Sequence, residues 1–335
     1  VSRGLGDVYK RQEENKRIMN FRPEIKILDA TLRDGGLVNN FYFTDEFVRD
    51  LYKANVKAGV DYMEFGYKAS KEIFDVDKFG KWKFCNEDDI RDIVGDNVSD
   101  LKISIMADVG RCDYKNDIVN RSDSAVDMVR VATYINTMPA AIEMIEDANR
   151  KGYETTCNIM AISNANETDI DIALEMLGKS CVDGIYIVDS YGSIYPEQMR
   201  VIADKYVEVG EKYGKEIGIH AHNNQQLAFA NTIESVSRGV NFLDATMSSM
   251  GRGAGNCAME LLLGFLKNPK YNLFPVLQFI EKHIAKLQQE GVVWGYDIPY
   301  LLTGRLNQHP SAAIDFTKEK RKDYSEFYQW LLERE

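Results

Sequence analysis

The sequence predicts an α/β fold, namely a closed (β/α)8 barrel with a helical C-terminal extension. Eight short apolar segments rich in β-branched residues occur between residues 25 and 245. Amphipathic segments separate them, and polar residues follow most of them directly. Strands that alternate with helices form a parallel sheet, and eight such units can close into a barrel. An open doubly wound sheet with the same alternation is the alternative.

The predicted strands are short apolar runs bounded by polar or turn residues. They lie, in chain order, at residues 25–29, 62–65, 102–107, 128–132, 155–160, 184–188, 217–220 and 242–245. Because the runs are apolar along most of their length, they are typical of strands that helices cover on one side and a barrel interior covers on the other.

The predicted helices carry N-terminal signals and one apolar face. Thr44 begins the first as an N-cap, with acidic residues in the first turn, and Pro196 stands near the first turn of a later one. Ile142, Ile145 and Ala148 share one face of another. The helices are predicted at residues 44–58, 140–151, 167–178, 195–213, 227–239 and 256–265. Each of these segments follows a predicted strand, as the barrel requires.

Charge and cysteine content exclude several classes of protein. The 335 residues carry 41 Lys and Arg against 52 Asp and Glu, a net charge of −11. This acidic balance argues against nucleic acid or an anionic membrane as a partner. No apolar run approaches the ~20 residues of a membrane span, and no N-terminal stretch resembles a signal peptide. The five cysteines are scattered without Cys-x-x-Cys spacing, so we expect free thiols and a cytoplasmic protein.

Three parts of the chain differ in pattern. Residues 1–18 lack periodicity and Met19 closely precedes the first strand, so we expect residues 1–18 to be a non-native or disordered leader. Residues 19–267 should form the catalytic barrel. Residues 268–335 contain a helical pattern at 274–290 and a charged, helix-like tail at 316–335, and should form a helical extension.

Polar residues gather where the predicted strands end, which is where barrel enzymes carry their chemistry. These residues include Asp34, Glu64, Tyr67, Asp108, Thr133, Asn158, Asp189, Ser190, His220, His222 and Asn256. Burying so many polar groups costs free energy unless they are paired or functional. We therefore expect the site at this end of the barrel.

The spacing of His220 and His222 is the sharpest local feature. Residues two apart on a strand point to the same side. Two imidazoles with a carboxylate can bind Mn, Zn or Fe, or Mg where more oxygen ligands are present. A pair of hydrogen-bonded structural histidines is the alternative.

Four further residues have both a structural and a functional interpretation. Asp34 could be a turn residue before two glycines, and Arg33 a surface ion-pair partner. Glu64 could pair with Arg33, and Asn256 could cap the helix that follows it. Each of these residues could equally belong to the site.

Taken together and in this order, these pieces resemble the metal-dependent lyase and synthase superfamily with an Asp-Arg-Glu signature on a TIM barrel. Within it the chain looks most similar to the 4-hydroxy-2-oxovalerate aldolase-like branch. The segments that carry the resemblance are residues 29–35, 63–66, 189–190, 220–223 and 251–256. They extend over nearly all of the predicted barrel.

The resemblance implies a divalent-metal site. Asp34, His220 and His222 would be ligands, with Asn256 as a fourth ligand or close neighbour. The implied cofactor is Mn or Mg, with Zn as a further candidate. Arg33 would hold the substrate carbonyl oxygen and stabilise an enolate.

The resemblance also implies roles around the metal. Glu64 would orient Arg33 or a metal-bound water, and Ser190 would position the substrate carboxylate. We add Asp189 and Asn158 to the substrate-binding set because they stand at strand ends.

Three positions depart from the family pattern and leave the general acid/base open. Leu37 stands where the hydroxy-oxovalerate aldolases carry a histidine, and Asn224 where the synthases carry Asp. The loop 246–250 lacks the cysteine of the hydroxymethylglutaryl-CoA lyases. The candidates for the proton carrier are Tyr67, Asp108, Asp189, Tyr300, His309 and a water held by the metal. We assign Tyr67 and His309, the latter on a C-terminal segment that could fold over the barrel mouth, to the catalytic set with Arg33 and Glu64.

The resemblance implies an aldolase, a carbon–carbon lyase that acts on a small 4-hydroxy-2-oxo acid through an enolate of pyruvate type. An acyl-CoA-dependent Claisen-type synthase is one alternative. A non-catalytic metal-binding barrel is the other, because Leu37 replaces the acid/base. The expected partners are a 2-oxo acid, a second copy of the chain in a homo-oligomer such as a homodimer, and an aldehyde dehydrogenase.

Overall fold

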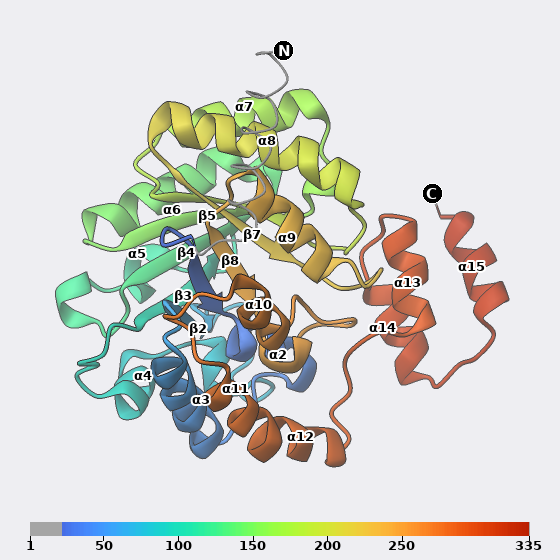
Figure 1. Ribbon diagram of the computed structural model, residues 1–335, viewed down its shortest axis with the longest axis horizontal. Coiled ribbons are helices and arrows are strands. Elements are labelled where there is room, and N and C mark those ends of the chain that lie inside the picture. The colour runs from blue at the N-terminus through green and yellow to red at the C-terminus, as the bar shows by residue number, and fades with distance from the viewer. Residues whose placement is uncertain (1–21, 335) are drawn as a thin grey trace, which may run out of the picture.

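The computed structural model describes residues 22–334 and shows a closed barrel of eight parallel strands (Figure 1). The strands are β1 Lys26–Asp29, β2 Tyr62–Tyr67, β3 Lys102–Asp108, β4 Met128–Thr133, β5 Glu154–Ile159, β6 Gly184–Asp189, β7 Glu216–Ala221 and β8 Phe242–Ala245. Strand β8 pairs with β1 and closes the sheet. The (β/α)8 TIM barrel is therefore confirmed, and the open sheet is excluded. The expected leader at residues 1–18 lies outside the described residues.

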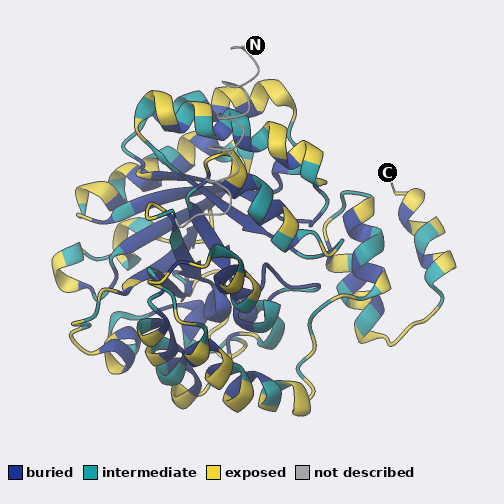
Figure 2. Cartoon of the chain, in the orientation of Figure 1, coloured by how far each residue is buried: buried dark blue, intermediate teal, exposed yellow. Residues whose placement is uncertain are grey.

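Two apolar clusters hold the barrel together, one on each side of the strands. Ile27 belongs to a large cluster between strands and helices, whereas its neighbour Leu28 belongs to a small cluster with Tyr62, Tyr186 and Phe242. This follows from the alternation of side chains along a strand. Figure 2 shows the strands as the most buried part of the chain and the helices as exposed on their outer faces.

The six helices predicted within the barrel are all present. They are α3 Asp45–Ala58, α6 Met138–Arg150, α7 Glu167–Lys179, α8 Pro196–Tyr213, α9 Ala228–Arg238 and α10 Met259–Leu266. Thr44 caps α3 as expected, since its side chain accepts a hydrogen bond from the Phe47 N–H at 3.2 Å. None of the described helices is both long and apolar enough to cross a membrane.

The segment after β1 is a helix, not the loop that the sequence suggested. Helix α2 spans Thr31–Asn39 and contains both Arg33 and Asp34, so the interpretation of Asp34 as a turn residue is wrong. The adjacent Gly35 and Gly36 conceal the helix, because glycine disfavours helix interiors. They are needed for close packing: a Cβ on Gly35 would lie 2.9 Å from the Met250 sulfur.

The helices after β2 and β3 also differ from the regular pattern. Helix α4 Glu87–Val94 follows β2 and was not predicted. After β3 the helix is reduced to the single turn α5 Tyr114–Asp117. The remaining strands keep their covering helices, so the barrel stays closed around its core.

The C-terminal extension is helical but divided. Helix α11 Leu273–Phe279 packs against α3, and Lys282 and His283 of a π-helical segment, Ile280–Ile284, also contact α3. Helix α12 Ala285–Gln289 follows directly. Three further helices, α13 Ile298–Arg305, α14 Ser311–Lys318 and α15 Tyr324–Leu332, stand at the side of the barrel (Figure 1). The charged tail at 316–335, expected as one helix, is thus broken between α14 and α15.

The three last helices contact the barrel through a glycine-rich loop. Ala254 in that loop lies in one apolar cluster with Tyr300, Phe316 and Phe327. The N–H of Gly295 donates to the carbonyl of Gly253 at 3.0 Å. This docking brings the segment between α13 and α14 to the mouth of the barrel.

Candidate metal centre

Three buried side chains converge at the carboxyl end of the barrel. Asp34 comes from the first turn of α2, His220 from β7, and His222 from just after β7. One ligand atom of each residue lies within 4.8 Å of the others. Helix α2 begins two residues after β1 ends, and its first turn is closed by the Asp34 N–H, which donates to the Ala30 carbonyl at 2.9 Å. This tight connection places Asp34 beside the histidines.

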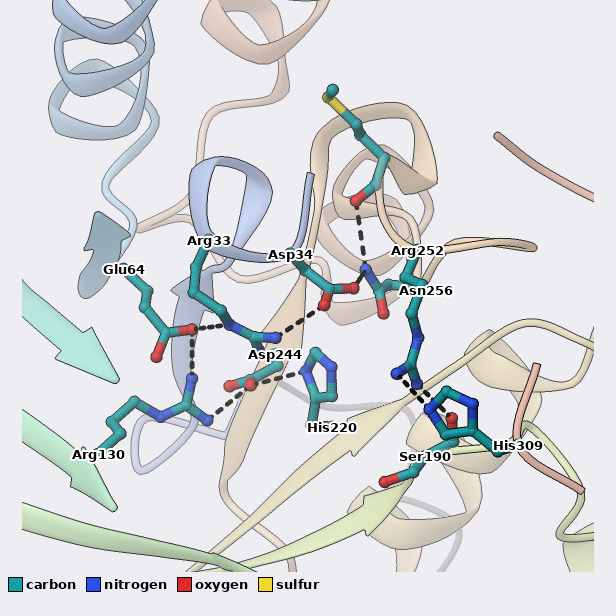
Figure 3. Close-up of polar contacts among 11 residues, drawn as sticks. Arg33, Asp34, Glu64, Arg130, Ser190, His220, Asp244, Arg252, Asn256 and His309 are labelled. Carbon is teal, nitrogen blue, oxygen red and sulfur yellow. Dashed lines mark hydrogen bonds and ion pairs between the residues drawn. The ribbon is translucent and has the colours of Figure 1, made fainter. Parts of the chain in front are cut away.

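Asn256 completes a fourth side of this cluster. It pairs with His222 in an isolated antiparallel bridge, and its amide nitrogen donates to the Asp34 carboxylate and to the Met250 carbonyl. Its amide oxygen is buried without a partner among the described residues. Figure 3 shows the contact between Asn256 and Asp34. A Cβ at Gly251 would collide with both residues, so only glycine leaves room for this contact.

His220 is held with one nitrogen available. Its Nδ1 lies 2.9 Å from a carboxylate oxygen of Asp244, and its Nε2 is buried without a partner in the described part of the chain. A carboxylate on Nδ1 fixes that nitrogen as the protonated one and leaves the lone pair on Nε2. This is the arrangement of a histidine that ligates a metal.

Arg33 is fixed by two carboxylates. Its Nε donates to Glu64 at 2.7 Å and its Nη1 donates to Asp34 at 2.8 Å. Its Nη2 has no partner among residues 22–334. The interpretation of Glu64 as a partner of Arg33 is therefore confirmed, and the Nη2 amino group of the guanidinium is left free beside the cluster.

Arg130 and Asp244 extend this network across the barrel. Arg130 donates to Glu64 at 2.9 Å and to Asp244 at 2.7 Å, and its guanidinium lies 4.4 Å from the centre of the Tyr186 ring. Figure 3 shows the resulting chain of contacts running from Asp34 through Arg33, Glu64, Arg130 and Asp244 to His220. The sequence interpretation missed Arg130 and Asp244. Their signal was a charged residue inside an otherwise apolar strand.

Electrostatics keep the cluster in its ligating forms. Burial raises the pKa of Asp34, but Arg33 and then the nearby histidines and Arg252 outweigh it and hold that pKa well below its usual value. Burial lowers the pKa of His222 well below its usual value. A carboxylate and a neutral imidazole are the forms that bind metal.

The donor set fits a divalent metal ion. One carboxylate oxygen, two imidazole nitrogens and one amide oxygen suit Mn, Zn or Mg. Three buried carboxylates against two guanidiniums also leave one negative charge in the network, counting Asp34, Glu64, Asp244, Arg33 and Arg130. A divalent cation bound by Asp34 would compensate this charge.

A second carboxylate–histidine group does not fit a metal in the same way. Glu46, Asp50 and His283 lie close together on the surface of α3 and the extension. The Lys282 ammonium already contacts Glu46 at 2.8 Å and Asp50 at 2.7 Å. Since a cation occupies that position, the centre at Asp34 is the one that we interpret as functional.

A small cavity opens above the metal centre. The predicted site residues that line it are Arg33, Asp34, Tyr67, Asn158, Ser190, His220, His222 and His309. Leu37 also lines it, so no acid/base replaces the missing histidine at that position. The expectation that the C-terminal segment folds over the barrel mouth is confirmed for His309.

Three predicted site residues lie outside the cavity lining, namely Asn256, Glu64 and Asp189. Asn256 contacts Asp34 from behind it. Glu64 is fully buried behind Arg33. The Asp189 carboxylate accepts hydrogen bonds from the N–H groups of Ser193 at 3.0 Å and Ile194 at 3.4 Å. Burial raises the pKa of Asp189 to about 7. Asp189 therefore shapes the loop after β6, and it does not line the cavity.

Comparison with known proteins shows the family to which the chain belongs. A family model described as HMGL-like matches residues 24–282, most of the chain. A 4-hydroxy-2-oxovalerate aldolase from Bacillus cereus is 25% identical over 288 residues, 83% of each chain. An oxaloacetate decarboxylase from Mycobacterium tuberculosis is 29% identical over 250 residues, 72% of this chain and 69% of that protein.

A solved structure has a similar fold. The crystal structure of the N-terminal domain of a candidate aldolase from Bacteroides vulgatus is 28% identical, with a TM-score of 0.72 over 88% of this chain and 96% of that one. The chain belongs to the HMGL-like family. It is an enzyme of the carbon–carbon lyase class, and the alternative of a non-catalytic barrel is set aside.

Proposed function

We propose that this HMGL-like enzyme is a divalent-metal-dependent aldolase. It would cleave a small 4-hydroxy-2-oxo acid into an aldehyde and the enolate of a 2-oxo acid such as pyruvate. One observation carries the proposal: Asp34, His220, His222 and Asn256 form a ligand set, and the free Nη2 of Arg33 lies beside it. Breaking a carbon–carbon bond next to a ketone requires stabilisation of the charge that develops on the ketone oxygen.

The metal and Arg33 would share this task. A divalent ion held by the four ligands would supply Lewis acidity to the ketone. Arg33 would donate its Nη2 hydrogen bond to the oxygen on which negative charge develops. Because Glu64 and Asp34 hold the other side of the guanidinium, the donor needs no reorganisation when the bond breaks.

Tyr67 is the group that we propose for proton transfer. It lines the cavity, and burial holds its pKa well above the usual value, so it stays a phenol. As the carbon–carbon bond breaks, the electron pair of that bond forms the enolate. The carbon that carries the substrate hydroxyl becomes the aldehyde carbon. The phenol oxygen would take the hydroxyl proton while its own proton goes to the enolate carbon, which leaves Tyr67 unchanged.

Deuterium exchange into the methyl group of pyruvate tests this proposal. The full chain is incubated with pyruvate and Mn or Mg in D2O, and exchange is followed by NMR before and after chelation. We expect metal-dependent exchange that falls by at least about 10³-fold in the variants Asp34→Ala and His222→Ala. Glu46→Gln, from the group that Lys282 occupies, is the matched control and should retain exchange. Absence of exchange in the protein with metal shown to be bound would reject the proposal.

Decarboxylation of a 2-oxo diacid is a second candidate, and Leu37 favours it. Loss of CO2 leaves the same enolate without removal of a proton from a hydroxyl group. Decarboxylation therefore needs no general base at the position where Leu37 lines this cavity. A relative at 29% identity carries the name oxaloacetate decarboxylase. Release of CO2 from oxaloacetate, compared with release of aldehyde from 4-hydroxy-2-oxo acids, decides between the two reactions.

The remaining expectations stay predictions. The family resemblance supports an aldehyde dehydrogenase partner, the scattered cysteines support a cytoplasmic location, and the amphipathic C-terminal helices suit a homo-oligomer. Size-exclusion chromatography with light scattering, alone and with such a dehydrogenase, measures the first two.

A further inference from the structure

Two side chains on the rim of the cavity meet from distant parts of the chain. Arg252 lies in the glycine-rich loop after β8, and His309 lies just before α14. The Arg252 Nη1 is 3.4 Å from the His309 Nε2. Figure 3 shows Arg252 extending away from Asn256 toward Ser190 and His309, on the opposite side of the centre from Glu64 and Arg130.

His309 is held as a hydrogen-bond donor toward the cavity. Its Nδ1 accepts a hydrogen bond from the Ser311 N–H at 3.1 Å. Ser311 is the first residue of α14, and its N–H has no partner within the helix. A neutral imidazole has one acceptor and one donor nitrogen. With Nδ1 as the acceptor, Nε2 carries the proton. Burial and the neighbouring Arg252 lower the pKa of His309, which keeps the ring neutral.

Two N–H groups therefore face each other without an acceptor between them. The Arg252 Nη1 carries only donors, and the His309 Nε2 carries a proton. Arg252 also donates through Nη2 to the Ser190 carbonyl at 3.0 Å, and its Nε is buried without a partner in the described part of the chain. A negatively charged oxygen placed between the donors would satisfy both.

Arg252 also differs from the other two arginines of the site in its charge balance. Arg33 and Arg130 each contact two carboxylates. Among residues 22–334, the side-chain contacts of Arg252 are a carbonyl and an imidazole, and neither of them carries a negative charge. Arg252 acts on Asp34 only from a distance, and no carboxylate contacts its guanidinium among the described residues, so a ligand carboxylate can take that place.

We propose that Arg252 and His309 form a subsite that binds a carboxylate of the substrate. Both residues line the same cavity as Arg33, Asp34 and the two histidines. One small molecule can therefore contact the metal centre and the Arg252–His309 pair together. The substrate class rests on the proposed function: the molecule is a 2-oxo acid. The carboxylate in the subsite is either the one next to the ketone or a second one at the far end of a diacid.

Calorimetric binding of two 2-oxo acids to the Mn-loaded full chain tests the subsite. The probes are pyruvate, with one carboxylate, and 2-oxoglutarate, with two. We expect Arg252→Gln to weaken binding of at least one probe by about 10- to 100-fold, because a charge-assisted hydrogen bond is lost. If pyruvate binding falls, the subsite holds the carboxylate next to the ketone. If only 2-oxoglutarate binding falls, it holds the distant one.

Paired variants separate the donor from a merely structural effect. His309→Asn keeps an acceptor near the Ser311 N–H but removes the donor, and should weaken binding about three- to tenfold. His309→Gln places an amide N–H near the position of Nε2 and should restore most of the affinity. Arg305→Gln changes an exposed arginine of α13 and is the matched control, with unchanged binding.

The outcomes also separate this inference from the proposed function. Loss of affinity in Arg252→Gln without any pyruvate exchange in the wild type would support the subsite and reject the aldolase. Exchange in the wild type with unchanged affinity of both probes in Arg252→Gln would reject the subsite and leave the aldolase intact. Failure of both probes to bind the Mn-loaded wild type would also reject the subsite.

Discussion

The floor and the rim of the cavity follow opposite rules of charge pairing. We define the floor as Arg33, Asp34, Glu64, Arg130, Asp244 and His220, and the rim as Leu37, Ser190, Arg252 and His309. On the floor, each guanidinium contacts two carboxylates at 2.7 to 2.9 Å. On the rim, Arg252 contacts no carboxylate among the described residues, and the polar side chain that its Nη1 meets is a second N–H donor.

This difference in charge pairing indicates which part of the site is complete before the substrate binds. The floor needs only a cation at the Asp34 end, so its geometry is fixed by the protein itself and suits transition-state stabilisation. The rim leaves donors unsatisfied, so a ligand completes it. We therefore expect changes on the floor to affect stability and turnover, and changes on the rim to affect mainly which substrate binds.

Breaking the pairing on the floor should produce the largest effect. Arg130→Met removes the cation between Glu64 and Asp244 and leaves two buried carboxylates with incomplete partners. Removing one partner from a buried ion pair typically costs about 3–5 kcal/mol of unfolding free energy. Chemical denaturation of the metal-loaded protein at pH 7 measures this loss.

An exposed ion pair supplies the matched control. Arg200→Met breaks a contact with Glu234 on the outer surface of the barrel. Since solvent screens such pairs, the variant should unfold close to the wild type. Equal destabilisation by Arg130→Met and Arg200→Met would mean that the pairing on the floor is no stronger than a surface contact.

Tyr67, between floor and rim, should affect turnover without affecting the metal. Tyr67→Phe removes the hydroxyl that we propose as the proton relay, and should slow exchange of the pyruvate methyl protons by about 10²- to 10³-fold. Metal affinity, measured by titration with Mn, should not change, because Tyr67 is not a ligand. NMR exchange rates at saturating pyruvate give the comparison.

A second cavity tyrosine controls for lost packing and polarity. Tyr191 lines the same cavity nearer the rim, and Tyr191→Phe makes the same chemical change. It should lower the exchange rate at most a few-fold. An unchanged rate in Tyr67→Phe would assign the proton to another group.

The sequence predicted the floor better than the rim for a physical reason. Strand ends of a parallel barrel meet at one edge, so Asp34, Glu64, His220 and His222 could be grouped from the chain order alone. The link through Arg130 could not, because it joins β4 to the distant strand β8 across the barrel interior. No spacing along the chain encodes such a contact.

The rim depends on loops, where side-chain direction does not follow a period. The glycine-rich loop was recognised, but nothing in its pattern showed that Arg252 would turn toward the cavity. The helix that carries Asp34 was missed because Gly35 and Gly36 weaken the helical signal. In both places a contact with a distant segment decides the local structure. Gly35 packs against Met250, and Arg252 contacts His309 and Ser190.

A buried carboxylate without a cation sharpens the comparison further. Asp29 ends β1, and its oxygens accept from the Thr31 N–H at 3.1 Å and from the Asn55 amide at 2.7 Å. Burial raises its pKa to about 6. Glu64 and Asp244, by contrast, contact arginines. Ionised Asp29 is therefore a cost that the folded state bears, not a source of stability.

The variant Asp29→Asn should relieve this cost in a pH-dependent way. The pKa of Asp29 is about 6 when folded and ~3.9 when unfolded. The wild type therefore loses stability as pH rises from about 4 to 6. The stability of the variant relative to the wild type should rise over the same window by up to about 3 kcal/mol. Asn55 can rotate its amide and offer its unpartnered oxygen to the new N–H group.

Unfolding free energies at pH 4.5, 5.5 and 7 measure this difference. Asp100→Asn, at an exposed position, controls for the loss of one acidic residue. A difference between Asp29→Asn and wild type that stays constant across the three pH values would show that the folded protein ionises Asp29 as easily as the unfolded chain does. Neutral hydrogen bonds would then stabilise a buried carboxylate as well as the arginines of the floor do, and the contrast between paired and unpaired charge would lose its force.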